Sequence, residues 1–226
     1  MKNRTLLTLL FCLVSWTLCS FTNADKQQPL SPDYIASIQG LITDVEDASS
    51  IEDLQNSALK FVELSKSHQD NWEAMYYAAY CYISMCAQER VPAQKAIYLD
   101  QAQSYIESAK QLTNNAELHI LQAYLYQSRA NGNINMSASN ATTLVTSSLA
   151  EAEKMDADNP RIYFLKAQNL YFLPSEAGGG LNNACPLIQE AIQKYETYQP
   201  ATPISPNWGQ NMTQEMFAVC QSAAKK

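Results

Sequence analysis

The sequence predicts an all-α protein on three observations. Helix-forming stretches at residues 74–80, 118–124 and 162–168 follow one another at a constant spacing of 44 residues. Apolar residues recur with the i, i+3, i+4 spacing of helices that bury one face, and capping residues precede them. No segment shows a convincing strand-like alternation of apolar and polar residues. A constant period of this size is typical of a stacked array of helical hairpins.

The first 24 residues have the features of a secretory signal peptide. Lys2 and Arg4 precede an uncharged apolar run over residues 6–19, and Ala24 supplies a small residue before the expected cleavage point. The run is shorter than the roughly 20 residues that cross a bilayer, and no later segment is a candidate span. We therefore expect an exported, periplasmic protein without an integral membrane span.

A lipid anchor at Cys19 is not expected. Trp16-Thr17-Leu18 precedes this cysteine, where a lipoprotein signal needs a small residue directly before the modified position. Cleavage after Ser20 is the alternative to cleavage after Ala24.

The charge of the mature chain excludes some partners. Loss of residues 1–24 leaves 13 of the 15 basic and all 22 acidic side chains, a net charge of −9. An acidic exported domain repels nucleic acid and anionic lipid surfaces, so we expect neither as a partner.

The remaining chain is expected to hold a short disordered leader, residues 25–30, and one helical domain, residues 31–226. Ser31-Pro32 gives the first helix a capping serine and a proline at its first position. Each repeat helix is expected to start at an Asn or Asp cap, at residues 70–71, 114–115 and 158–159. A proline-rich connector near residues 199–207 cannot be regular helix. The expected hairpins span residues 31–67, 70–112, 114–155 and 158–196, and a C-terminal capping helix spans residues 208–223.

Four cysteines remain after the signal peptide. Export permits disulfides. Cys81 and Cys86 are five residues apart on a predicted helix and point to different sides, so we expect buried thiols. Cys185 and Cys220 lie on elements that could touch, and the sequence leaves a disulfide between them open.

Two columns of the repeat carry a family resemblance. Small residues are followed three positions later by mostly aromatic ones, at Ala79, Ala123 and Ala167 and then at Tyr82, Tyr126 and Leu170. This pattern resembles the tetratricopeptide repeat, in which a small residue lets two helices approach and an aromatic ring fills the adjacent gap. The resemblance implies a right-handed array of antiparallel helical hairpins. The period of 44 exceeds the 34 residues of that family.

Two shorter motifs carry a second resemblance. Residues 173–180 and Pro206-Asn207-Trp208-Gly209 are similar to segments of exported repeat proteins of Bacteroidetes-type bacteria. They are more loosely similar to segments of the helical-repeat partner subunits of tripartite periplasmic transporters. This resemblance implies a periplasmic location and no particular ligand.

The tetratricopeptide resemblance also implies a binding surface. In such arrays certain helix positions line a concave groove, and tyrosine there offers a rigid aromatic face and a hydroxyl to an extended peptide. The alternative is that these rings pack between repeats. The expected partner-binding residues are Tyr76, Tyr80, Ile120, Tyr124, Gln168 and Tyr171.

The predicted function follows from this groove. We expect a non-enzymatic periplasmic scaffold that binds a protein or peptide segment in the groove. The alternative is a small-ligand-binding accessory subunit of a periplasmic transport system. An open groove favours a peptide, whereas an apolar cavity of several hundred Å³ favours a small molecule.

Catalytic, metal and cofactor sites are not expected. His68 and His119 are the two histidines, and neither has partners at ligand spacing. The run Gly178-Gly179-Gly180 could hold an anion before a helix, but it lacks the Lys and Ser/Thr of a nucleotide loop, which favours a flexible hairpin loop. Glycosylation sequons would matter only in a eukaryote, at Asn135, Asn140 and Asn211.

Overall fold

The computed structural model describes residues 29–132, 134 and 136–223, and these residues form helices and loops without a strand. The all-helical prediction is confirmed. The signal peptide, Cys19 and Asn135 lie outside the described residues. The helices are α1 (Pro32–Glu46), α2 (Ile51–Ser67), α3 (Glu73–Gln88), α4 (Pro92–Leu112), α5 (Ala116–Asn131), α6 (Ala138–Met155), α7 (Pro160–Phe172), α8 (Leu181–Thr197) and α9 (Gln210–Ala223), with a short 3-10 turn at Ser175–Ala177. None of these helices combines the length and apolar character needed to cross a membrane.

Local hydrogen bonds explain where most helices begin. The Ser31 hydroxyl accepts from the Tyr34 amide at the start of α1, and Asn115 caps α5 in the same way. Ser50 and Asp53 form a reciprocal cap at α2. The start of α3 differs from the prediction, since Trp72 stands at its N-terminal boundary and makes no side-chain capping bond. Its ring packs at the edge of Tyr76 instead, with ring centroids 5.7 Å apart.

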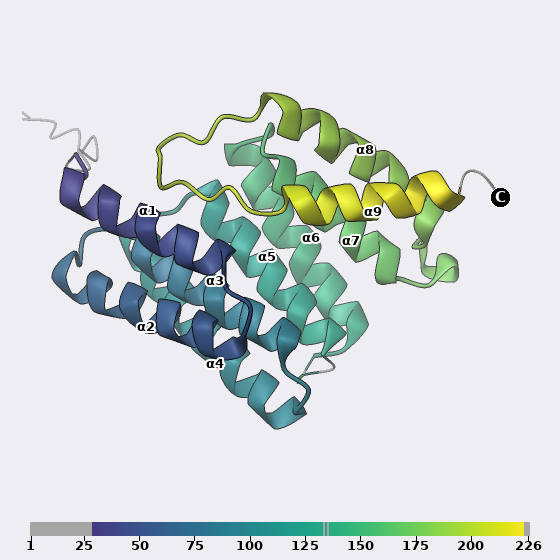
Figure 1. Cartoon of the computed structure of the whole chain (residues 1–226). Coiled ribbons are helices and arrows are strands. Elements are labelled where there is room, and N and C mark those ends of the chain that lie inside the picture. Colours follow the sequence, from purple (N-terminus) through teal and green to yellow (C-terminus); the bar gives the residue numbers. More distant parts are fainter. Residues whose placement is uncertain (1–28, 133, 135, 224–226) are drawn as a thin grey trace, which may run out of the picture. The chain divides into compact units, whose positions relative to one another are not determined.

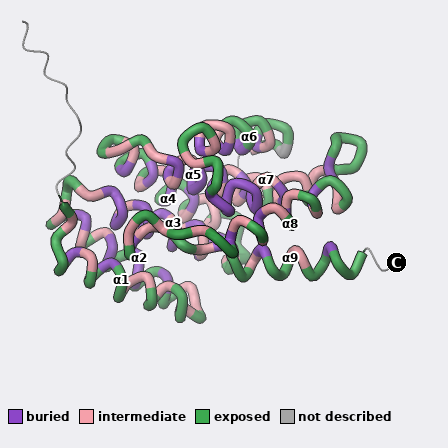
Figure 2. The backbone as a smooth tube through the Cα atoms, turned by 90° about the horizontal axis from the view of Figure 1, so that it is seen from above, coloured by how far each residue is buried: buried purple, intermediate pink, exposed green. Residues whose placement is uncertain are grey.

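Successive helices pack as hairpins, and alternate helices lie side by side. α3 packs on α4, α5 on α6 and α7 on α8, while α5 contacts both α3 and α7 (Figure 1). The row α3, α5 and α7 therefore carries most of the buried residues, whereas α1 and α9 bury few (Figure 2). Ala79, Ala123 and Ala167 have no exposed surface, so the small-residue column lies in the core.

The segment between α8 and α9, residues 198–209, is the connector. It leaves α8, runs across towards α3 and returns to α9, which packs on α8 (Figure 1). Tyr77 donates a hydrogen bond to the carbonyl of Ile204 at 3.0 Å, and the Ile204 side chain is fully buried. Gly209 ends the connector with a φ of 104°, and a Cβ there would lie 2.4 Å from the Tyr195 hydroxyl. This turn therefore requires glycine.

A disulfide ties the last helix to the array. Cys185 of α8 and Cys220 of α9 are bonded to each other across 35 residues of sequence. Cys81 and Cys86 are free and buried. A disulfide that closes the connector loop agrees with export to an oxidising compartment.

Reduction of this disulfide should destabilise the fold. We expect the free energy of unfolding to fall by about 3 kcal/mol, because an unbridged 35-residue loop gains chain entropy when the protein unfolds. Urea unfolding followed by circular dichroism, with and without a thiol reductant, measures the change. The reductant should leave the Cys185→Ser/Cys220→Ser variant unchanged. A wild-type curve that does not move under reductant contradicts the prediction.

Candidate functional site

The six predicted partner-binding residues divide into three kinds of environment. Tyr76 and Ile120 have no exposed surface, so neither can contact a partner at the surface. Tyr80 and Tyr124 are partly buried beneath the connector. Gln168 and Tyr171 lie on α7 beside α9 and line an apolar cavity.

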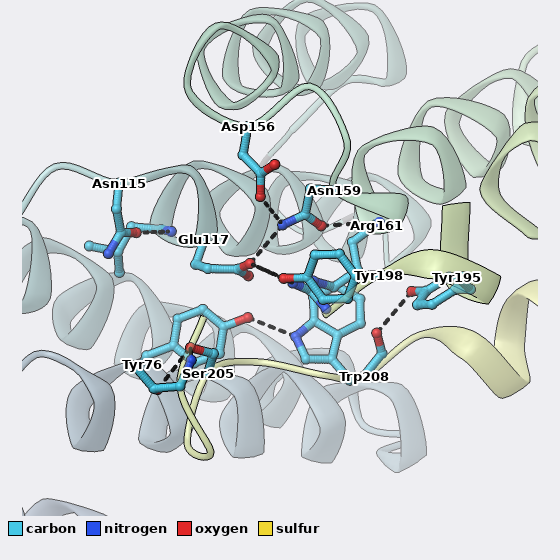
Figure 3. Close-up of polar contacts among 12 residues, drawn as sticks. Tyr76, Asn115, Glu117, Asp156, Asn159, Arg161, Tyr195, Tyr198, Ser205 and Trp208 are labelled. Atoms are coloured by element: carbon cyan, nitrogen blue, oxygen red, sulfur yellow. Dashed lines mark hydrogen bonds and ion pairs between the residues drawn. The ribbon is translucent and has the colours of Figure 1, made fainter. Parts of the chain in front are cut away.

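The connector fills the inner face of α3 and α5 with a tryptophan. The Trp208 indole stacks on Tyr80 and on Tyr124, with centroid separations of 5.4 and 5.2 Å and interplanar angles below 30°. Its Nε1 donates a hydrogen bond to the Tyr76 hydroxyl at 2.7 Å (Figure 3). Burial raises the pKa of Tyr124 to about 12 and the pKa of Tyr76 well above its usual range. The tyrosine surface expected to bind a peptide is thus occupied by the chain itself.

A buried polar cluster holds both ends of the connector. Arg161, at the start of α7, is fully buried and pairs with Glu117 of α5. Its Nη2 also donates to the Tyr198 hydroxyl at 2.9 Å (Figure 3). The guanidinium carbon lies 5.1 Å from the ring centroid of Tyr198 and 5.8 Å from that of Trp208. Asn159, the cap of α7, donates to Glu117 at 2.7 Å.

The charge balance of this cluster favours a permanently ionised arginine. Burial by itself would lower the pKa of Arg161, but the adjacent Glu117 carboxylate together with the hydroxyl groups of Tyr76, Tyr198 and Tyr195 outweighs it and raises the pKa. Within the described part of the chain, three buried atoms of this pair have no hydrogen-bond partner, namely Arg161 Nε, Arg161 Nη1 and Glu117 Oε2. Ion pairs of this kind stabilise a fold only while both partners are present. The cluster therefore anchors the connector to α5 and α7.

Two large cavities flank the connector, and polar residues make up much of the lining of both. One, of about 850 Å³, lies beside Glu117, Asp158 and Lys194. The other, of about 810 Å³, lies between α1 and the connector, with Glu46 and Asn207 among its walls. Polar walls of this extent are unlike those of most sites for small organic ligands, which are mainly apolar.

A smaller cavity between α7 and α9 has the walls of a ligand site. Its volume is about 370 Å³, within the 300–1,000 Å³ typical of such sites. α7 contributes Phe164, Gln168, Tyr171 and Phe172. Leu181 adds to this wall, and α9 supplies the opposite one with Met212, Glu215, Met216 and Val219.

Exposed aromatic rings mark the rim of this cavity. Phe172 is 59% exposed and Tyr171 39% exposed, and their rings meet edge to face at 5.1 Å. Val219 on the α9 side is also exposed. Adjacent exposed apolar side chains around a cavity are typical of a recognition surface.

The sequence contained a signal for this site that the groove interpretation did not use. Phe164, Gln168, Tyr171 and Phe172 have the i, i+4, i+7, i+8 spacing of one helix face. The prediction rested on tetratricopeptide groove positions, and these do not include Phe164, Phe172 or the α9 residues. The position of α9 beside this face also depends on the disulfide, which the sequence left open.

Metal ligands do not gather at the cavity. Within the described residues no group of three or more His, Cys, Asp or Glu side chains could hold a metal ion. His68 packs on the Tyr34 ring at the end of α2. His119 Nε2–H donates a hydrogen bond to Asn114 Oδ1 at 2.8 Å, and burial, with help from Lys110, lowers the pKa of His119.

Comparisons with known proteins give a structural neighbour. No family model matches the chain, and no curated protein matches it. Among solved structures the chain is similar to the HusA haemophore from Porphyromonas gingivalis, with a TM-score of 0.76 and 22% sequence identity. The match covers 88% of this chain and 98% of that one. At this identity the likeness shows a shared all-helical fold. The neighbour that shares it comes from a Bacteroidetes bacterium.

The predicted protein-binding scaffold is wrong. The structural neighbour is described as a haemophore, which agrees with the small-ligand alternative and not with capture of a protein segment. The structure supplies the physical reason, because Trp208 and Ile204 occupy the face on which a peptide was expected to lie.

Loss of the Trp208 ring should destabilise the whole unit. We expect Trp208→Ala to lower the free energy of unfolding by about 3 kcal/mol, since truncation of a packed aromatic ring leaves a void. Trp208→Phe should cost about 1 kcal/mol, because it retains an aromatic ring and loses the hydrogen bond to Tyr76. Urea unfolding measures both. Equal, small effects of the two variants would contradict the stacked arrangement.

Removal of one charge from the buried pair should cost more than removal of both. We expect Glu117→Leu to lower the free energy of unfolding by about 3–5 kcal/mol, because Arg161 is then buried without its partner. Glu117→Leu/Arg161→Met should be more stable than this single variant. As a control, Asp100→Leu removes the exposed partner of Arg129 and should cost about 1 kcal/mol or less. A double variant that is less stable than the single one overturns the prediction.

Proposed function

We propose that this protein is an exported carrier of a small, planar and largely apolar ligand of the tetrapyrrole class, haem or its metal-free ring. The observation that carries the proposal is the apolar cavity between α7 and α9, with exposed Tyr171 and Phe172 at its rim. The fold shared with a haemophore supports the ligand class.

The side chains that line the cavity suit contact with the flat ring of such a ligand better than contact with its carboxylates. Phe164, Phe172 and Tyr171 offer aromatic faces and edges, which stack on flat π-systems. Met212 and Met216 offer flexible, polarisable surface that adapts to ligand shape. No wall residue is cationic, so the ring would insert, and a carboxyl group of the ligand would face water whenever it is ionised.

Iron coordination would have to come from residues other than histidine. Tyrosine and methionine are known haem ligands, and Tyr171, Met212 and Met216 stand at this cavity. His68 and His119 are placed elsewhere, in contacts with Tyr34 and Asn114. We infer that contact with the ring supplies most of the affinity, so that the metal-free ring binds about as well as haem.

The remaining parts of the proposal concern architecture and place of action. The three hairpins α3–α4, α5–α6 and α7–α8 are copies of a tetratricopeptide-like unit with a 44-residue period, which the repeated sequence supports. The protein acts without catalysis in the periplasm, where it holds its ligand for a transport system. The bonded Cys185 and Cys220 support an oxidising compartment.

Spectroscopic titration with haem and with metal-free protoporphyrin tests the proposal. We expect saturable binding of both, with dissociation constants within about threefold of each other. Phe172→Ala should weaken binding about tenfold, since one well-packed aromatic contact is worth about 1.4 kcal/mol. The thermal midpoint should barely change, because Phe172 is exposed.

Leu59→Ala is the matched control for this experiment. Leu59 is 53% exposed on α2, similar to Phe172, and it does not line the cavity. Its substitution should leave both dissociation constants unchanged. Absence of saturable binding, or equal effects of Phe172→Ala and Leu59→Ala on the dissociation constants, would contradict the proposal.

A further inference from the structure

The 44-residue repeat relates the cavity between α7 and α9 to the tyrosine surface of α3 and α5 that Trp208 covers. Tyr80, Tyr124 and Gln168 occupy the same position in three successive repeats. In the first two repeats this position stacks on Trp208 of the connector. In the third repeat it faces the open cavity between α7 and α9. The third repeat thus presents an equivalent position that the chain's own tryptophan does not cover.

The side chain at this third position is polar and unsatisfied. Gln168 Oε1 is buried and has no hydrogen-bond partner among the residues that the structure describes. Gln122 is held by neighbours, since it pairs with Gln103 and Lys110. Gln127 donates to the Leu165 carbonyl at 2.7 Å, and its own buried oxygen also lacks a partner among the described residues, but Gln127 does not line the cavity. A buried acceptor left without a donor destabilises the folded protein.

The walls around Gln168 are mostly apolar, and none of the described residues donates a hydrogen bond to its oxygen. Phe164 and Leu181 flank it on the α7 and α8 side, and Met212 and Met216 stand opposite. Glu215 is the charged residue of the wall, and as a carboxylate it only accepts hydrogen bonds. A small number of polar groups in a mainly apolar wall fixes the orientation of a bound ligand, and Gln168 supplies such a group with a buried, unpaired acceptor.

We propose that Gln168 orients the ligand by accepting a hydrogen bond from a ligand N–H or O–H through its buried side-chain oxygen. This inference rests on the proposed function and narrows it to ligands that carry a donor beside or within an apolar ring. In a tetrapyrrole the donor is either a pyrrole N–H of the metal-free ring or a carboxylic acid O–H. In the ligand-free protein the Gln168 oxygen lacks a hydrogen-bond donor, and the bound ligand supplies one.

Gln168→Met tests this role because methionine has the same length and no acceptor of comparable strength. In the ligand-free protein we expect the thermal midpoint to rise by about 2–4 °C, since an unsatisfied buried group is removed. Affinity for metal-free protoporphyrin should fall about threefold to tenfold. A residue with a purely structural role would not raise stability while lowering affinity. Gln168→Leu gives a second, independent variant.

Gln127→Met is the control, because Gln127 is a buried glutamine outside the cavity. It should leave the affinity for both ligands unchanged, because Gln127 does not line the cavity. Titration of Gln168→Met with haem as well identifies the donor. A loss confined to the metal-free ring assigns the donor to the pyrrole N–H, and an equal loss for both ligands assigns it to a carboxylic acid.

The inference is overturned if Gln168→Met and Gln168→Leu bind both ligands as the wild type does. If Phe172→Ala still weakens binding in that case, the proposed function stands and only the role of Gln168 fails. If the wild type binds neither ligand, the proposed function fails and the role of Gln168 fails with it.

Discussion

The stacking of Trp208 against both Tyr80 and Tyr124 is the interaction on which the rest of the structure depends. It places the connector on the inner face of α3 and α5, and the hydrogen bond to Tyr76 fixes the indole in its plane. Because the same segment then turns at Gly209 into α9, the position of Trp208 also decides where α9 begins. The aromatic surface that α3 and α5 would otherwise expose is therefore covered by the chain's own connector.

The buried arginine explains why the connector takes one path. Arg161 contacts Tyr198, where the connector starts, and the ring of Trp208, where it ends, while Glu117 balances its charge. A buried guanidinium is costly without a partner, so alternative paths that expose or unpair it are disfavoured. Such a group contributes little to net stability and much to the uniqueness of the arrangement, which suits a segment with few regular backbone hydrogen bonds of its own.

These constraints leave one apolar cavity beside the third repeat. α9 is held at its start by the connector and near its end by the disulfide to α8, so its methionines stand opposite Phe164 and Gln168. A walled cavity of a few hundred Å³ suits a small planar molecule and is too small for a folded partner. The closed groove and the open cavity therefore have a common cause in the path of the C-terminal segment.

The sequence by itself determined the helical class, because cap residues, i, i+4 periodicity and a 44-residue period are local signals that tertiary packing did not override. It also named Gln168 and Tyr171, two residues of the cavity, through their repeat positions. It could not show that Tyr76 and Ile120 are fully buried, or that Phe172 and Met216 share a cavity wall. Those facts depend on contacts between residues far apart in the chain, such as Tyr76 with Trp208, and an irregular proline-rich connector has no periodicity from which its path could be inferred. Only the tertiary structure decided which part of the tyrosine-rich face the protein covers with its own chain.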